Sequence, residues 1–298
     1  MSTQPVRYQS PEEDSARWTD FPFRDGDIVI STRSKSGTTW AQMICALLIF
    51  QSTELPAPLE EISPWLDFQV APKEEVYERL AAQEHRRFIK THTPLDGIPI
   101  DDRVTYIVVA RHPLDMAVSL YYQGNNIDRD RMAALTMHPA PGDPSKPQIP
   151  VHDWLLAWIR AERDPREAMD SLPGVMWHLA DAWARRSHSN ILLVHYADLS
   201  ADLDGQMRYI ADRLDITVPN ECWPELVEAA TFTRMRERSS QLIPGASGVL
   251  KDPEAFFRRG SSGAGRELLS AEEMADYEHC AAALAYQDQD LISWLHRP

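Results

Sequence analysis

A short segment rich in hydroxyl side chains is the strongest candidate for chemistry in this chain. It reads S-T-R-S-K-S-G-T-T-W over residues 31–40, with Lys35 two positions before Gly37. Its hydroxyl donors are Ser34, Ser36, Thr38 and Thr39. A lysine supplies a point charge for an anion, and a glycine lets the backbone approach a phosphate closely. The segment therefore predicts a phosphate-binding turn between a strand and a helix. An ordinary turn rich in serine and threonine is the alternative.

The order of residues in this segment differs from the Walker A pattern, in which the lysine follows the second glycine. Here Lys35 precedes Gly37, and the first glycine of the pattern is absent. A nucleoside triphosphate site would also need an acidic ligand for Mg²⁺ after a strand, and none is apparent. A nucleotide or small-molecule kinase with a variant loop stays one alternative function. A non-catalytic nucleotide-binding module is another.

A lysine and a histidine stand at the end of a second apolar run, R-F-I-K-T-H-T-P over residues 87–94. Lys90 and His92 are two residues apart, so their side chains lie on the same face of an extended chain. Parallel sheets bind ligands in the crevice outside the carboxyl ends of their strands. A neutral histidine there can accept a proton from a hydroxyl group. His92 is thus the candidate general base, against the alternative of an ordinary core or surface histidine.

Two further segments carry arginines suited to phosphate. The segment 108–122 places Arg111 at the end of a third apolar run and Ser119 two turns into the helix that follows. Arginine binds phosphate with two parallel hydrogen bonds, although Arg111 could instead pair with Asp115. The segment F-F-R-R-G-S-S-G-A-G-R, residues 256–266, is basic and rich in glycine. Its candidate phosphate ligands are Arg258, Arg259 and Gly260.

Elements that can position these residues follow from the apolar pattern. Four short apolar runs, at residues 27–32, 87–90, 105–110 and 191–196, predict buried strands. Segments with helical periodicity lie beside them, which predicts an α/β fold with a central parallel sheet flanked by helices. Residues 123–150 and 236–265 are rich in proline or glycine and predict lids or binding loops. The first twenty residues are expected to form an N-terminal extension of a single domain, 1–298.

Composition limits the classes of partner. The formal net charge of −15 opposes binding to nucleic acid and to heavily sulfated polysaccharides. No stretch is apolar and long enough to span a membrane, and the polar N-terminus does not predict a signal peptide. The three cysteines are far apart and show neither metal-site nor disulfide spacing. A cytoplasmic protein without stable membrane insertion is therefore expected.

Four segments, in chain order, resemble the motifs of the cytosolic sulfotransferase family. K-S-G-T-T-W (35–40) resembles the family's 5′-phosphosulfate loop, and K-T-H-T-P (90–94) its Lys-[Thr/Ser]-His-x-Pro motif. The segment 108–122 resembles its 3′-phosphate motif, and R-R-G-S-S-G (258–263) its Arg-Lys-Gly-x-x-Gly loop. The resemblance spans roughly residues 20–270. It implies a P-loop-like sulfotransferase fold. It also implies sulfuryl transfer from 3′-phosphoadenosine-5′-phosphosulfate (PAPS) to a hydroxyl group, leaving 3′-phosphoadenosine-5′-phosphate (PAP), with no metal.

The same resemblance implies roles for single residues. His92, Lys35, Lys90 and Ser119 form the expected catalytic set, with His92 as the base and Lys35 on the leaving oxygen. The 5′-phosphate would be held by residues 35–39 and the 3′-phosphate by Arg111, Ser119 and the loop 258–260. The adenine would lie near Trp40, Tyr196 and Phe232.

The acceptor side is less defined by the sequence. Trp65 and Phe68 match in place a family segment that lines the acceptor pocket, and Trp154 and Trp158 add apolar surface on a predicted helix. Such residues suit a phenol, a sterol or the apolar part of a glycolipid, and they are equally compatible with core packing. The acceptor is expected to be a small-molecule or lipid-like hydroxyl compound. The dimerisation motif of many animal members is not evident, so a homodimer would use another surface.

Overall fold

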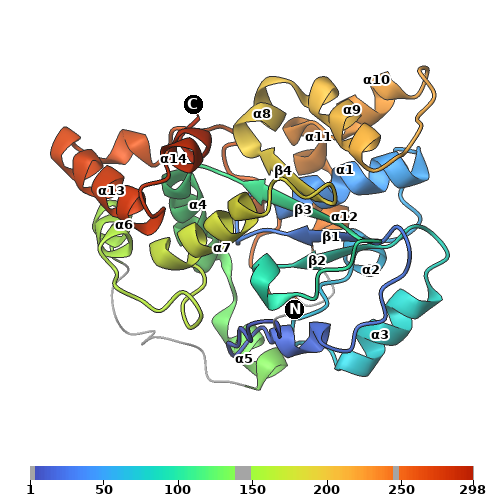
Figure 1. The fold of residues 1–298 in the computed structure, drawn as a ribbon, viewed down its shortest axis with the longest axis horizontal. Helices are drawn as coiled ribbons and strands as arrows, with labels where there is room; N and C mark the ends of the chain where they lie inside the picture. Colours follow the sequence, from blue (N-terminus) through green and yellow to red (C-terminus); the bar gives the residue numbers. More distant parts are fainter. Residues whose placement is uncertain (1–3, 138–148, 244–247, 298) are drawn as a thin grey trace.

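A parallel sheet forms the centre of the molecule (Figure 1). The computed structural model describes residues 4–137, 149–243 and 248–297. Within them the strands are β1 (Ile28–Ser31), β2 (Phe88–Thr91), β3 (Thr105–Ala110) and β4 (Ile191–His195). Their order is β2-β1-β3-β4 with every neighbouring pair parallel. These strands lie within the four predicted apolar runs or one residue beyond them, which confirms the predicted fold class.

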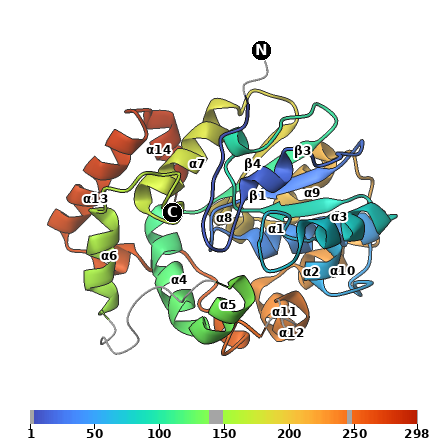
Figure 2. The ribbon, with the colours of Figure 1, turned by 90° about the horizontal axis from the view of Figure 1, so that it is seen from below.

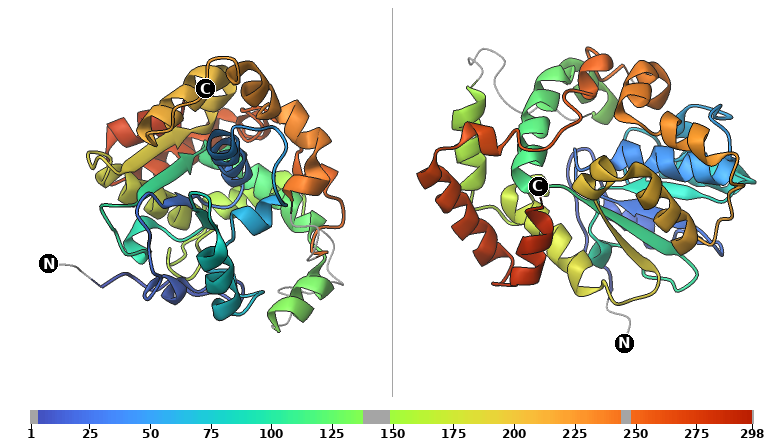
Figure 3. Two further views of the ribbon diagram at one scale, coloured as in Figure 1. Left: turned by 90° about the vertical axis from the view of Figure 1, so that its right-hand side faces the viewer. Right: turned by 90° about the horizontal axis from the view of Figure 1, so that it is seen from above.

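Helices cover both faces of the sheet, as the two views of Figure 3 show. Ile28 and Ile30 of β1 pack with α1 (Thr38–Phe50), α9 (Leu203–Arg213) and α10 (Trp223–Ala229). Val29, between them, faces the other layer, which contains α4 (Pro113–Asn126), α7 (Leu172–Ala184) and α13 (Ala271–Leu284). Apolar residues therefore point to both faces, which is why the strands read as continuous apolar runs.

The remaining helices complete these layers (Figure 2). They are α2 (Leu59–Ile62), α3 (Lys73–Ala82), α5 (Arg129–Thr136), α6 (Val151–Ile159), α8 (Tyr196–Ala201), α11 (Phe232–Glu237), α12 (Ser239–Leu242) and α14 (Gln289–Leu295). Short 3₁₀ turns occupy Ser15–Trp18, Leu95–Gly97, Glu254–Phe256 and Arg266–Leu268. No helix of the described residues is long and apolar enough to cross a membrane.

The two segments predicted as lids or binding loops contain short helices, so they are not irregular throughout, and their role as lids stays a prediction. Helix α4 continues to Asn126 and α5 follows, with the Asp128 carboxylate accepting a bond from the backbone N–H of Arg131 at 2.9 Å. The segment 236–265 contains the end of α11, all of α12 and a 3₁₀ turn. The two segments also meet through an antiparallel bridge between Ile127 and Leu250. Residues 138–148 and 244–247 lie outside the described residues.

The N-terminal segment is built into the domain and is not the extension that the sequence predicts. Tyr8 and Trp18 have no exposed surface. The Trp18 indole N–H donates to the Asp67 carboxylate at 3.1 Å, and the Tyr8 hydroxyl donates to Asp96 at 2.8 Å. A backbone bridge pairs Glu13 with Phe68. The buried rings of Tyr8 and Trp18 therefore fix a segment whose polar composition predicts little packing.

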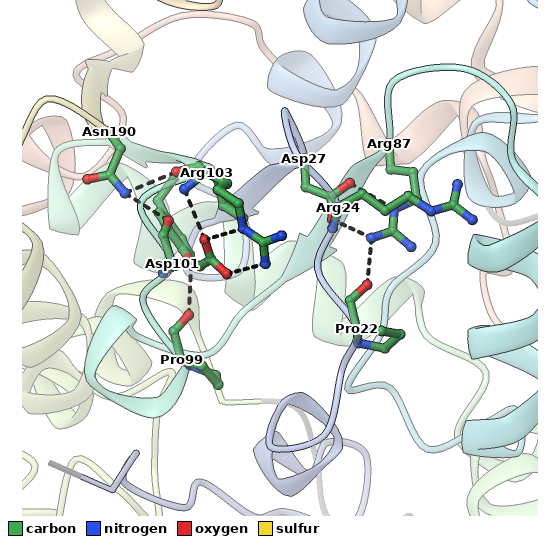
Figure 4. A network of polar contacts seen from close by, with 10 residues as sticks. Pro22, Arg24, Asp27, Arg87, Pro99, Asp101, Arg103 and Asn190 are labelled. Atoms are coloured by element: carbon green, nitrogen blue, oxygen red, sulfur yellow. Dashed lines mark hydrogen bonds and ion pairs between the residues drawn. The ribbon is translucent and has the colours of Figure 1, made fainter. Parts of the chain in front are cut away.

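A buried ion pair lies at the amino-terminal ends of strands β1 and β2 (Figure 4). The Arg87 and Asp27 side chains are each 2% exposed and bond to each other through two nitrogens and two oxygens. Arg87 also donates to the Pro22 carbonyl at 2.9 Å, and Asp27 accepts the Arg24 backbone N–H at 2.8 Å. The pair therefore links the residues that directly precede β1 and β2.

Arg87→Met is expected to lower the free energy of unfolding by about 3–5 kcal/mol, because Asp27 would keep a buried charge without its partner. Urea unfolding followed by circular dichroism measures this loss. Arg103→Gln is the matched control, since its pair with Asp101 is 56% exposed on the arginine side and is worth less than about 1 kcal/mol. Equal effects of the two substitutions would contradict the structural role of the buried pair.

Candidate active site

A cleft opens at the carboxyl ends of β1, β3 and β4. The chain passes from β2 on one side of β1 to β3 on the other, and ligands of open parallel sheets bind at such a switch point. Twelve of the predicted donor-site residues line this cleft: Lys35, Gly37, Thr38, Thr39, Trp40, Arg111, Ser119, Tyr196, Phe232, Arg258, Arg259 and Gly260. Ser36 is buried beneath it, at 2% exposed. The structure thus brings together residues that are up to 225 positions apart in the sequence.

The turn between β1 and α1 brings backbone amides to the cleft. Gly37 precedes the first residue of α1 with a φ of 111°, a conformation that favours glycine. A Cβ at this position would lie 3.3 Å from the Tyr196 ring. The hydroxyls of Thr32 and Thr38 bond to each other beneath the turn. The first-turn amides of a thirteen-residue helix therefore face the cleft, where they favour an anion.

Lys35 lies at the floor of this cleft in the left-handed region, with a φ of 65°. Its ammonium group lies 3.5 Å from the centre of the Phe256 ring and 3.4 Å from the Phe256 carbonyl oxygen. Burial lowers the pKa of Lys35, and together with the charges of Arg111, Lys90 and Arg258 it brings the pKa to about 7. An anion in the cleft would relieve both effects.

Two arginines in the cleft have unpaired nitrogens. The Arg111 guanidinium donates to the carbonyls of Lys35 and Ser261, each at 3.2 Å, and stacks 4.3 Å from the centre of the Tyr196 ring. Within the described residues, its Nε atom and that of Arg258 are buried and have no hydrogen-bond partner. Buried donors of this kind need a partner, which a bound phosphate would provide.

Asp115 is a positioning residue that the sequence did not indicate as one. Its carboxylate accepts the backbone N–H groups of Gly263 and Gly265 at 2.8 and 2.9 Å. These bonds fasten the 258–265 loop to the first turn of α4, so the alternative pairing of Asp115 with Arg111 is not observed. The Gly265 Cβ position would lie 2.4 Å from Leu114, which explains why only glycine fits there.

Aromatic rings form the remaining wall of the cleft. The Trp40 indole N–H donates to the Ala230 carbonyl at 2.9 Å, and its ring meets Tyr196 edge-on at 5.1 Å. Phe232 packs against Gly260, where a Cβ would lie 2.5 Å from the ring. The sequence analysis missed Met235, Phe256 and Phe257, which also line the cleft. The Arg259 guanidinium pairs with Glu267 at 2.9 Å and is 42% exposed.

His92 lies directly after β2 with its ring held by the neighbouring strand. Its Nδ1 bonds to the Thr32 carbonyl oxygen, and Arg33 donates to the His92 carbonyl oxygen. Because a carbonyl only accepts, Nδ1 carries the proton and the neutral ring keeps a lone pair on Nε2. Burial lowers the pKa of His92 well below its usual value, and the charges of Lys90 and Arg33 act in the same direction. The imidazole is therefore neutral at pH 7.

The predicted acceptor aromatics lie beside this histidine. The Trp65 and Phe68 rings are stacked at 4.1 Å, and the Trp65 ring meets the His92 ring edge-on at 4.6 Å. The Lys90 ammonium group lies 3.8 Å from the centre of the Trp65 ring. Burial lowers the pKa of Lys90 to about 8. Lys90, His92 and the two aromatic rings thus form one cluster.

The other two tryptophans have different surroundings. Trp158 is 7% exposed, belongs to the core and donates to the Asp170 carbonyl at 2.8 Å. Trp154 is on α6, as is Trp158, and its ring centre lies 5.5 Å from that of Tyr121 on α4. Both residues contribute to packing, and an acceptor-binding role for them stays a prediction.

Comparison with known proteins gives the family. Residues 25–284 match the sulfotransferase domain family. The chain belongs to the sulfotransferase family. It is 40% identical to a glycolipid sulfotransferase of Mycobacterium bovis, over 99% of this chain and 95% of that protein. It is 26% identical to sulfotransferase 1A1 of Rattus norvegicus, over 85% and 80% of the two chains. The protein is therefore a sulfotransferase, and the kinase and non-catalytic alternatives are not supported.

Solved structures with low sequence identity share the fold. Mouse sulfotransferase SULT7A1 in complex with PAP has a TM-score of 0.69 at 17% identity, covering 95% of this chain and 93% of that one. Retinol dehydratase in complex with androsterone and the inactive cofactor PAP has a TM-score of 0.68 at 20% identity, covering 94% and 89%. These similarities confirm the predicted sulfotransferase fold.

Proposed function

We propose that this sulfotransferase uses PAPS as its donor and transfers the sulfuryl group to a hydroxyl of a lipid-like acceptor. The observation that carries the proposal is the pairing of two features around the ends of β1 and β2. One is a cleft lined by Lys35, Arg111 and Arg258, whose positive charges favour an anionic ligand. The other is a neutral histidine, outside the cleft lining, whose ring bonds to the carbonyl of Thr32, while the Thr32 hydroxyl bonds to Thr38 in the cleft. The glycolipid sulfotransferase among the relatives supports the acceptor class.

The donor would be held by residues of three loops. The first-turn amides of α1, with Thr38 and Thr39, would bind the 5′-phosphate. Arg111 and Arg258 would bind the 3′-phosphate through the Nε atoms that have no partner within the described residues, and Ser119 would add a hydroxyl. Trp40 and Phe232 line the same cleft and would enclose the adenine. The residues present therefore fit a nucleotide with phosphates at both ends of its ribose.

Transfer would proceed by in-line displacement at sulfur. The acceptor oxygen forms the new O–S bond while the bond from sulfur to the bridging oxygen breaks, and the acceptor proton passes to Nε2 of His92. Lys35 would stabilise negative charge on the leaving oxygen, and Lys90 would stabilise the sulfuryl oxygens. Fixed cations aimed at developing charge are commonly the largest source of rate enhancement.

Several parts of the expected function stay predictions. Among the described residues, no group of three or more His, Cys, Asp or Glu side chains is arranged to hold a metal ion. Independence from metal is predicted from the family resemblance alone. A cytoplasmic location, the absence of nucleic acid as a partner and a homodimer also stay predictions.

His92→Ala is expected to lower kcat about 10²-fold or more, because the acceptor proton would lose its general base. Single-turnover sulfation assays measure this loss, and PAP binding measured by calorimetry serves as the control for an intact donor site. A decrease of less than tenfold with full PAP binding would assign the base to another residue.

Arg111→Ala is expected to weaken PAP binding by roughly tenfold to 100-fold, since it removes charged hydrogen bonds worth about 1.5–3 kcal/mol. Binding of AMP, which lacks the 3′-phosphate, should change much less. Isothermal titration of both nucleotides against both proteins gives the comparison. Equal losses for PAP and AMP would contradict the assignment of Arg111 to the 3′-phosphate.

PAP binding is expected to weaken as the pH rises above 7. Lys35 has a pKa of about 7 in the free protein, and bound phosphate raises that pKa, so binding takes up a proton at pH 8. Calorimetry at pH 8 in two buffers of different ionisation enthalpy measures the uptake. Lys35→Met should abolish it. Binding without net proton uptake in the unaltered protein would show that Lys35 does not face the nucleotide.

A further inference from the structure

A buried arginine connects the histidine that follows β2 to a distant turn of the chain. Arg33 lies after β1, in the loop that leads to Lys35, and its side chain is 2% exposed. One terminal nitrogen of its guanidinium donates to the His92 carbonyl oxygen, and the other donates to the Asp170 carboxylate at 2.7 Å. A planar guanidinium holds its partners in fixed directions, so Arg33 sets the position of His92 relative to Asp170.

Asp170 is itself held in place, because it lies in a tight turn before α7. The Ser171 hydroxyl caps that helix by accepting the Gly174 backbone N–H at 3.2 Å. A Cβ at position Gly174 would lie 2.4 Å from the Met169 carbonyl oxygen, so the turn is closely packed. The Trp158 indole N–H donates to the Asp170 carbonyl oxygen at 2.8 Å. Asp170 is therefore a fixed point to which the arginine can attach the histidine.

Three consecutive residues at the end of β1 bind the segment that carries His92. The Ser31 hydroxyl donates to the Thr93 carbonyl oxygen at 2.7 Å. The Thr32 carbonyl accepts the Nδ1 proton of the His92 ring, and Arg33 donates to the His92 main chain. Of these three contacts, the one from Arg33 also brings a positive charge. A substitution of Arg33 therefore removes that charge and leaves the other two contacts in place.

Arg33 is the neighbour of His92 whose positive charge is permanent. The titratable groups whose charges act on His92 are Lys90 on β2, Arg33 in the loop after β1, and His178 on α7. Burial and the Arg33 charge bring the pKa of His178 to about 3, so that ring is neutral. Burial is the main cause that lowers the pKa of Lys90 to about 8, so its charge is lost under mildly alkaline conditions. A guanidinium stays protonated throughout.

Three carboxyl groups act on the Arg33 guanidinium in turn. Burial alone would lower the pKa of Arg33, but the charges of Asp170, Glu13 and Asp67 raise it above its usual value. Burial raises the pKa of Glu13 to about 8, so this side chain is mostly protonated at pH 7. Asp170 is the one of the three that forms a hydrogen bond to Arg33, and its side chain is 37% exposed. Water can therefore solvate Asp170 when Arg33 is replaced.

We propose that Arg33 is a positioning residue for sulfuryl transfer: it holds His92 in place against Asp170, and its charge keeps the imidazole in the neutral form that accepts a proton. This inference rests on the proposed function, in which Nε2 of His92 takes the acceptor proton. Arg33 is not among the residues that line the cleft, so it acts through His92 and not on the nucleotide. A ring that already carried a proton could not serve as the base.

A positioning role and a purely structural ion pair lead to different results. Burial lowers the pKa of His92 most, and the charges of Lys90 and Arg33 lower it further. Removal of the Arg33 charge therefore raises the pKa of His92, and the ring takes up a proton at a higher pH than in the unaltered protein. Loss of an ion pair that served stability alone would lower the melting temperature and leave the titration of His92 where it was.

Arg33→Met and Arg33→Lys test the inference by NMR titration of protein with isotope-labelled histidines, in which the His92 signal is assigned from its loss in His92→Ala. In Arg33→Met the midpoint of the His92 titration should rise by about one pH unit or more, the usual effect of a nearby charge. Arg33→Lys keeps the charge and should titrate like the unaltered protein. Arg166→Met is the matched control and should shift nothing, because Arg166 is 61% exposed and pairs with Asp164 on the surface.

Single-turnover sulfation of octanol at saturating PAPS, followed against pH, measures the effect on transfer. The rate of Arg33→Met at pH 7 should fall roughly tenfold or more, because a base that is no longer fixed loses its alignment. The acid limb of its pH profile should move to higher pH together with the His92 titration. Arg33→Lys should keep the position of the acid limb and recover only part of the rate, since an ammonium group lacks the fork that bridges His92 and Asp170.

An unchanged His92 titration in Arg33→Met would overturn the inference, whatever happens to the melting temperature. If Arg33→Met does not fold, Arg33→Lys decides the matter, because a full rate in that variant would show that the bridge to Asp170 does not position the base. PAP should bind to each folded variant nearly as it does to the unaltered protein, as calorimetry can show. Failure of the unaltered protein to bind PAP would instead remove the proposed function itself, which the titration of His92 does not test.

Discussion

The site depends on the joint between the ends of β1 and β2, where backbone carbonyls and one arginine hold a single histidine. The Thr32 carbonyl accepts the Nδ1 proton of His92, and Arg33 donates to the His92 carbonyl. The parallel register that pairs Ser31 with Thr91 makes both bonds possible. The same loop continues without interruption into Lys35 and Gly37. The position of His92 and the position of the turn that holds Lys35 and Gly37 are therefore set by one continuous piece of backbone.

Positive side chains are gathered in the cleft of a protein whose net charge is negative. The chain carries a net charge of −15, yet burial and the nearby charges of Arg111, Lys90 and Arg258 lower the pKa of Lys35. Mutual repulsion and burial make these cations costly to hold without a ligand. A bound nucleotide relieves that cost, so part of its affinity comes from strain in the free protein. A net charge of −15 opposes the approach of long polyanions, whereas a small anion can still reach cations that are gathered in one cleft.

Local features of the site could be predicted from the sequence, and contacts between distant segments could not. The strands are buried on both faces, so they appear as short apolar runs, and the loops after them carry Lys35, His92 and Arg111. Asp115 bonds to Gly263 across 148 positions, and no local pattern indicates such a pair. The proline-rich segment gives no clear helical pattern, because the Asp128 cap of the short helix α5 is a weak signal. Glu13 lies in a polar stretch whose burial depends on Tyr8 and Trp18.

The cleft and the surroundings of His92 differ in which buried polar atoms have no hydrogen-bond partner within the described residues. A protein that binds only an anion needs donors, and the donor cleft leaves the Nε atoms of Arg111 and Arg258 for that purpose. A site that binds a hydroxyl compound uses acceptors as well as donors, because a hydroxyl both donates and accepts a hydrogen bond. Glu13 and Asp67 are both buried, and burial raises the pKa of Glu13 to about 8, so at pH 7 its side chain is mostly protonated and can donate as well as accept a hydrogen bond.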